Sequence, residues 1–201
     1  MQDEYQDILD FWFGPISGEV CEENRQKLWF MGGVEIDEEI KQRFGDRVVM
    51  ASEGALEHWL ETPEGNLAYV ILLDQFTRNI YRKQARAFAS DHLARKACRA
   101  GLAKGFDQQL APIQRVFFYL PLEHSEDLAD QQECCDLYAA LRDCVSEQNE
   151  PVFAGFYDYA VKHHDIIAQF GCFPHRNDVL GREGTEEQNR WLEESGVRFG
   201  Q

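Results

Sequence analysis

Apolar residues recur every three or four positions along most of this chain, which is the spacing of one buried face of an α-helix. The first such segment, about residues 5–13, stops at Gly14-Pro15. Segments with the same spacing follow at about residues 36–60, 65–81, 91–105, 112–122, 128–145 and 151–170, and from 185 onward. No stretch alternates between apolar and polar residues as a half-buried strand does. The pattern predicts one all-α domain over residues 1–201, with about eight or nine helices in antiparallel hairpins.

Capping residues and glycines mark the expected helix ends. Thr62-Pro63-Glu64 is a typical helix start, because threonine caps, proline suits the first helical position and the acid favours the positive end of the dipole. Thr185 and Gln188 form a capping box for the last helix. Gly45 and Gly54 are candidate breaks in the segment 36–60.

A helix capped by Ser90-Asp91 resembles the first helix and turn of a tetratricopeptide-type hairpin. It has small alanines on one face and a terminal Gly-Phe-Asp at residues 105–107. The 34-residue period of that repeat is not visible elsewhere. We therefore expect a tetratricopeptide-repeat-like arrangement with degenerate repeats.

Composition and charge exclude several classes of partner. The 201 residues include 20 bases and 36 acids, for a net charge of −16, which repels nucleic acids and anionic membranes. The longest apolar runs, 69–73 and 116–122, are far shorter than the roughly 20 residues that span a bilayer. The N-terminus lacks a basic and apolar leader. These features predict a cytoplasmic protein whose six cysteines are reduced, apolar side chains.

The positive charge is concentrated in one part of the sequence. Residues 75–115 hold nine bases and only two acids, so that this basic segment carries +7 while the rest of the chain carries −23. Such a segment either binds an anion or an acidic partner, or pairs with the acidic helices of its own chain.

Polar residues stand among apolar ones in three segments, where burial of a charge is costly unless it is paired. The first segment is 72–81, the second 117–127 and the third 162–177. Pro121 predicts a kink or break in the second segment. Adjacent histidines on a helix point apart, so at most one of His163 and His164 faces a shared site. The candidate pocket residues are Asp74, Arg78, Tyr81, Glu123, His124, His164, His175, Arg176 and Asn177.

Several chemistries suit these residues. An anion site would use Arg78 and Arg176 with histidine and asparagine donors. Acid–base catalysis would use His124 or His164, oriented by Glu123 or Asp74. A metal site would draw on His124, His164 and His175 with Glu123 or Asp165, but no H-E-x-x-H or similar spacing occurs, and no metal ligand is assigned. The remaining alternative is a satisfied buried network that fixes helix packing.

Four motifs of the chain carry a resemblance to a known family. They are Ile8–Phe13, Leu72–Tyr81, Phe118–Glu126 and Phe173–Asn177. The chain resembles, from about residue 5 to 195, a mainly bacterial family catalogued as domain of unknown function nine-two-four. The resemblance implies an all-helical fold similar to tetratricopeptide-repeat proteins and carries no known reaction. Thr77 stands where the family usually has proline, a change that a helix interior tolerates.

The main hypothesis is a binding protein for a small anionic ligand or an acidic peptide or protein partner, held in a polar pocket. The first alternative is a hydrolase-type enzyme with a His/Glu/Arg acid–base or metal-assisted site. The second is an assembly protein with an exposed aromatic surface built from Trp12, Trp29 and Trp59 or from the Phe-rich segments.

Overall fold

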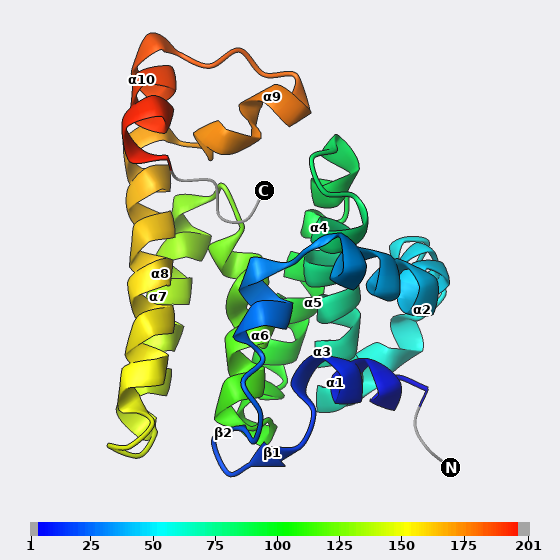
Figure 1. The fold of residues 1–201 in the computed structure, drawn as a ribbon. Coiled ribbons are helices and arrows are strands. Elements are labelled where there is room, and N and C mark those ends of the chain that lie inside the picture. Colours follow the sequence, from blue (N-terminus) through cyan, green and yellow to red (C-terminus); the bar gives the residue numbers. More distant parts are fainter. Residues whose placement is uncertain (1–3, 197–201) are drawn as a thin grey trace.

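The computed structural model describes residues 4–196, and nearly all of its regular structure is helical (Figure 1). The α-helices are α1 (Gln6–Phe13), α2 (Val34–Ser52), α3 (Pro63–Val70), α4 (Thr77–Ile80), α5 (Asp91–Ala103), α6 (Pro112–Glu123), α7 (Leu128–Cys144), α8 (Glu150–Phe170), α9 (Asn177–Leu180) and α10 (Glu186–Ser195). Short π-helical and 3₁₀ segments connect them: η1 (Lys27–Met31), η2 (Glu57–Glu61), η3 (Ile71–Phe76), η4 (Ala85–Phe88), η5 (Asp107–Gln109) and η6 (Pro174–Arg176). The all-α fold class is confirmed.

A buried helix lies at the centre of the fold. It starts where Thr62 accepts a hydrogen bond from the backbone N–H of Gly65 at 3.1 Å, which confirms the predicted cap. It continues without interruption through α3, η3 and α4, and every residue from 65 to 78 is buried. Such a helix is surrounded on all sides, and α1, α2, α5 and α6 pack around it. Thr77 is accommodated because its hydroxyl donates to the carbonyl of Leu73 at 2.8 Å.

The helices α7 and α8 form a long pair beside this centre (Figure 1). A turn at residues 145–149 joins them, so that they run antiparallel. The helix α6 contacts both members of the pair and also α3 and α5, so it connects the two parts of the fold. The end of α6 is therefore a place where side chains from several helices can meet.

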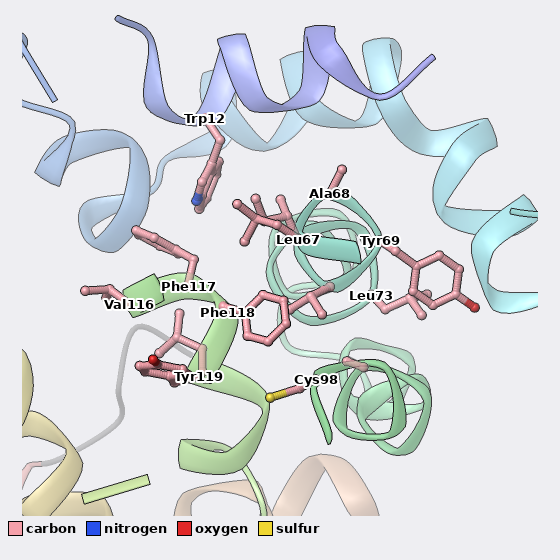
Figure 2. Close-up of a cluster of buried hydrophobic side chains, with 14 of the residues drawn as sticks. Trp12, Leu67, Ala68, Tyr69, Leu73, Cys98, Val116, Phe117, Phe118 and Tyr119 are labelled. Atoms are coloured by element: carbon pink, nitrogen blue, oxygen red, sulfur yellow. The ribbon is translucent and has the colours of Figure 1, made fainter. Parts of the chain in front are cut away.

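Aromatic side chains fill the main core (Figure 2). Trp12 is fully buried, and its ring lies 5.4 Å from that of Phe76 and 5.6 Å from that of Phe117, measured between centroids. Trp59 is buried as well, and the half-buried Trp29 donates from its ring N–H to the carbonyl of Trp12 at 2.9 Å. The three tryptophans hence belong to the core and do not form the exposed aromatic surface of the assembly hypothesis. A second, small cluster joins α8 to the C-terminal segment through Ile166, Ile167 and Phe173.

Three local expectations differ from the structure. Pro121 does not break its helix, because it lies in the last turn of α6 and removes only one hydrogen-bond donor there. Gly45 lies inside α2, whereas Gly54, at φ +79°, follows its end. A two-residue hairpin, β1 (Ile16–Ser17) with β2 (Val20–Cys21), was not predicted, because strands this short leave no alternating pattern.

Two further observations concern the whole described chain. None of its helices has the length and apolar character needed to cross a membrane. All six cysteines are free thiols. The tetratricopeptide-repeat likeness stays a prediction.

Candidate functional site

The three polar segments meet at the end of α6. Asp74 comes from η3, His124 follows the last residue of α6, and Arg176 lies in η6. One carboxylate oxygen of Asp74, Oδ1, lies 2.8 Å from Nδ1 of His124. Arg176 donates from Nη1 to the carbonyl oxygen of His124 at 3.0 Å. Residues that are far apart in the sequence thus form one polar cluster, which we call the Asp74 network.

Asp74 is an ionised carboxylate inside the protein. Its side chain is fully buried, and the amide of Gln75 donates to Oδ2 at 2.6 Å. Arg78 Nη1 lies 3.4 Å from Oδ1. Burial alone raises the pKa of Asp74, but the charge of Arg78 and the contact with His124 outweigh burial and hold this pKa well below its ordinary range. The carboxylate lies on a π-helical turn, a wide turn that often occurs at functional sites.

Asp91 neutralises the two arginines of the network. Arg78 donates two hydrogen bonds to its carboxylate, at 2.9 and 3.0 Å, and Arg176 Nη1 lies 3.8 Å from it. The ring of Phe88 covers both guanidinium groups, with centroid distances of 5.4 Å to Arg78 and 4.8 Å to Arg176. The two cations proposed for an anion site are therefore already engaged inside the protein.

A second acid–histidine pair lies beside the first. Oε1 of Glu123 is 3.2 Å from Nδ1 of His163, and both side chains are buried. Burial and the negative charge of Asp74 raise the pKa of Glu123 to about 8. Burial and the neighbouring His124 lower the pKa of His163 well below its ordinary value, and burial and Arg78 lower that of His124. At neutral pH Asp74 is thus ionised and Glu123 protonated, while the imidazoles beside them are neutral. Two carboxyl groups whose pKa values differ this widely are typical of acid–base sites.

The remaining candidate residues have other contacts, although His175 lies near enough to His163 to affect its charge. His164 points away from the network and contacts the exposed Asp165, with 3.2 Å between Nδ1 and Oδ1, so that His163 occupies the place expected for His164. His175 packs on Phe173 at 5.6 Å between ring centroids. Asn177 donates to Gln188 at 3.1 Å and joins α9 to α10.

Sequence reasoning missed three members of the network: Asp91, Phe88 and His163. Asp91 had been interpreted with Ser90 as a helix cap, yet Ser90 makes no capping hydrogen bond. His163 could have been preferred to His164 from its helical spacing, because it lies three residues after the buried Ala160 and four before the buried Ile167.

Tyr81 lines a separate cavity of about 340 Å³ between α2, α4, η4 and α5. Its walls are formed by Val48, Ser52, Thr77, Tyr81, Arg86, Ala89, Ser90, His92 and Leu93. None of these nine residues is acidic. The guanidinium of Arg86 stacks on the ring of Tyr81 at 4.2 Å. We call this space the Arg86 cavity.

A second cavity, of about 390 Å³, lies along α5 and shares His92 with the first. It is lined by His92, Arg95, Lys96, Arg99, Asp127 and Asp130. Two of its cations are already paired, because Arg95 contacts Asp130 at 3.0 Å and Arg99 contacts the same carboxylate. It therefore offers less unpaired positive charge than its composition suggests.

Most of the basic segment is paired with acids of the same chain. Arg78, Arg82, Arg95, Arg99 and Lys104 each make an ion pair with a carboxylate. Within residues 4–196, the bases of this segment that reach no carboxylate are Lys83, Arg86, Lys96 and Arg115. Arg86 is the member of this group that lines the first cavity.

Comparison with known proteins gives a family and a related structure. A family model described as bacterial protein of unknown function (DUF924) matches residues 8–196. A solved structure of a protein of unknown function from Agrobacterium tumefaciens is similar to this chain, with 39% sequence identity and a TM-score of 0.79. The match covers 94% of this chain and 97% of that one. No curated protein matches the sequence.

Proposed function

Because this chain belongs to the bacterial DUF924 family, whose function is unknown, we propose a function from its geometry: it binds a small anion in the Arg86 cavity. The ligand class is a carboxylate or a phosphate monoester, because a guanidinium recognises both through paired hydrogen bonds.

The observation that carries this proposal is the charge of the cavity wall. The protein has a net charge of −16, yet the nine residues around the cavity include no carboxylate and do include Arg86 and His92. A negatively charged surface repels anions, so a wall that lacks acids and holds an unpaired guanidinium is a place where an anion meets little repulsion.

The size and the donors of the cavity also fit a small ligand. A volume of 340 Å³ lies at the lower end of ordinary ligand pockets, which begin at about 300 Å³. Within the described residues, the hydroxyls of Tyr81 and Ser90 form no hydrogen bond, so both are available as donors. Thr77 and Ser52 donate to backbone carbonyls instead, at 2.8 and 2.7 Å. The cavity accommodates a compact anion better than an extended acidic peptide.

Isothermal titration calorimetry with inorganic phosphate, with succinate and with an acidic peptide tests this function. We expect binding of phosphate or succinate, and a loss of roughly tenfold or more in affinity for Arg86→Ala, because a hydrogen bond to a charged group contributes about 1.5–3 kcal/mol. Lys96→Ala is the matched control, since it removes an exposed, unpaired cation that lines the other cavity. Equal affinity of Arg86→Ala and wild type for each of these ligands, or binding of the peptide alone, would overturn the proposal.

A second candidate function is acid–base hydrolysis at the Asp74 network, favoured by the 2.8 Å contact between Asp74 and His124. An imidazole oriented by a buried carboxylate is a competent general base. In a screen of chromogenic phosphate and carboxylate esters, His124→Asn should abolish turnover while the far-ultraviolet circular dichroism stays unchanged. His164→Asn, outside the network, should retain turnover.

A further inference from the structure

We propose that this chain binds one divalent transition-metal ion through Glu123, His124 and His163. One ligand atom from each of these side chains lies within 4.8 Å of the other two. This site uses other residues than the Arg86 cavity and does not depend on anion binding there. It also differs from the histidine set that the sequence suggested, because it contains His163 in place of His164 and His175.

The three ligand side chains lie close together, with one ligand atom of each within 4.8 Å of the other two. Bonds of about 2.0–2.1 Å in a tetrahedral zinc site place neighbouring ligand atoms about 3.3 Å apart. Nδ1 of His163 lies 3.2 Å from Oε1 of Glu123, but it also donates to the carbonyl oxygen of Tyr159 at 2.8 Å, so the nitrogen of this ring that would bind the ion is Nε2. The rings of His124 and His163 have centroids 6.1 Å apart, inclined at 64°. Ion binding would therefore require the side chains to rotate until the ligand atoms, now within 4.8 Å, are about 3.3 Å apart.

Asp74 orients one of the ligands. Its carboxylate lies 2.8 Å from Nδ1 of His124, which fixes the proton on that nitrogen and leaves Nε2 with the lone pair. A carboxylate behind a metal-binding imidazole is the usual supporting contact in such sites. Gln75 in turn holds Asp74 through a hydrogen bond of 2.6 Å. Asp74 is thus a positioning residue, and it gives the site a support that a chance cluster lacks.

The charges around the site accommodate a cation. Asp74 and Asp91 supply two negative charges that balance the two positive charges of Arg78 and Arg176, and Glu123 is the ligand that can add a further negative charge. Glu123 releases its proton when it binds the ion, so that its carboxylate supplies this charge on binding. Two imidazoles and one carboxylate suit zinc and the neighbouring first-row metals better than magnesium or calcium, which prefer oxygen ligands.

One ligand of the site reaches the protein surface. Glu123 and His124 come from the end of α6 and His163 from the middle of α8, so the ligands project from two facing helices as in helix-bundle metal sites. The side chain of His124 keeps 15% of its surface exposed, while those of Glu123 and His163 keep 6% and 5%. With three protein ligands, the ion retains an open position for water.

Titration of chelator-treated protein with Zn²⁺ tests the proposal. All proteins carry Cys144→Ser, because the exposed thiol of Cys144 is a competing zinc ligand. We expect one ion per chain, and an affinity reduced more than tenfold in Glu123→Gln and in His163→Asn. His164→Asn, one position further along the same helix, should bind as the parent protein does. Asp74→Asn should keep the stoichiometry and lose roughly 10–100-fold in affinity.

Cobalt provides a readout that does not depend on a variant. Co²⁺ bound by two imidazoles and a carboxylate in a tetrahedral site should give an intense visible absorption band that saturates at one equivalent. Circular dichroism of each metal-free variant shows whether it has folded. The proposal is overturned if the folded parent takes up no stoichiometric Zn²⁺ or Co²⁺, or if His164→Asn weakens binding as much as His163→Asn does.

Discussion

The buried carboxylate of Asp74 lies 2.8 Å from Nδ1 of His124, a residue 50 positions further along the chain. This contact joins the central helix to the end of α6. Since Arg176 donates to the carbonyl of the same His124, the C-terminal segment is tied to the same point. The three segments that carry polar residues among apolar ones are therefore joined through Asp74 and His124.

Replacement of Asp74 by asparagine should strongly destabilise the protein. The change removes the charge that balances Arg78 and the acceptor that holds His124, both in a fully buried place. Loss of one partner of a buried ion pair costs about 3–5 kcal/mol. Urea unfolding measures the difference. Asp165→Asn, which alters an exposed acid beside a histidine, should stay within about 0.5 kcal/mol of wild type. Similar losses in both variants would contradict a special role for Asp74.

The fold could be predicted from sequence because helical periodicity and capping are local signals. Thr62 and Thr185 cap the helices where expected, with hydrogen bonds of 3.1 and 3.2 Å from the backbone N–H groups of Gly65 and Gln188. The π-helical turn around Asp74 was not predictable, because it changes the winding of the backbone without leaving a pattern in residue types. The short hairpin at residues 16–21 was missed for a similar reason.

The candidate site could be predicted only in part. Asp74, Arg78, Glu123, His124 and Arg176 were identified, because charged residues among apolar ones need buried partners. Which partners they take is a matter of three-dimensional contact. Asp91 belongs to the network through Arg78, which is 13 residues away, and no periodicity links the two positions. The Arg86 cavity likewise depends on how four elements pack.

Glu123→Gln should change how stability depends on pH in metal-free protein. The folded pKa of Glu123 is about 8 against an ordinary 4.5, so between these values the folded chain keeps a proton that the unfolded chain has released. Wild-type stability must therefore fall as pH rises through this window, by up to about 1.4 kcal/mol per pH unit. Glutamine stays neutral and removes this contribution.

Urea unfolding at several values between pH 5 and pH 8, with a chelator present, measures this effect. The stability of wild type relative to Glu123→Gln should decrease steadily as pH rises, because the other titrating groups, His163 and Asp74 among them, are common to both proteins. Parallel pH profiles would show that Glu123 ionises normally in the folded chain.

A matched pair of glycines tests the packing of α5 against the core. A Cβ at Gly101 would lie 2.5 Å from Cζ of Phe118 and 3.1 Å from Nδ2 of Asn66, both fully buried. We expect Gly101→Ala to cost about 1–3 kcal/mol through overpacking. Gly155 lies in α8 with no atom near its Cβ position, so Gly155→Ala should stabilise by about 0.4–1 kcal/mol. Thermal unfolding should give a lower melting temperature for Gly101→Ala and a higher one for Gly155→Ala. Equal shifts of the melting temperature would contradict the close contact of α5 with Phe118.

The C-terminal segment should open independently of the core when Glu126 is removed. Glu126 accepts a hydrogen bond from the backbone N–H of Phe173 at 2.8 Å and two from Arg182, at 2.7 and 3.0 Å. The apolar cluster beneath this segment is small, with three buried residues, so these polar contacts supply much of its attachment.

Hydrogen exchange followed by mass spectrometry measures this opening in Glu126→Ala. Amides of α9 and α10 should exchange roughly tenfold or more faster, since hydrogen bonds to a charged group contribute about 1.5–3 kcal/mol. Amides of α3, in the centre of the fold, should keep their protection. Glu187→Ala is the control, because Glu187 contacts only the side chain of Gln169, at 3.4 Å, within the described chain. Faster exchange throughout the molecule would contradict this prediction. A contact that holds only the C-terminal segment cannot change the exchange of core amides, so Glu126 would then support the entire fold.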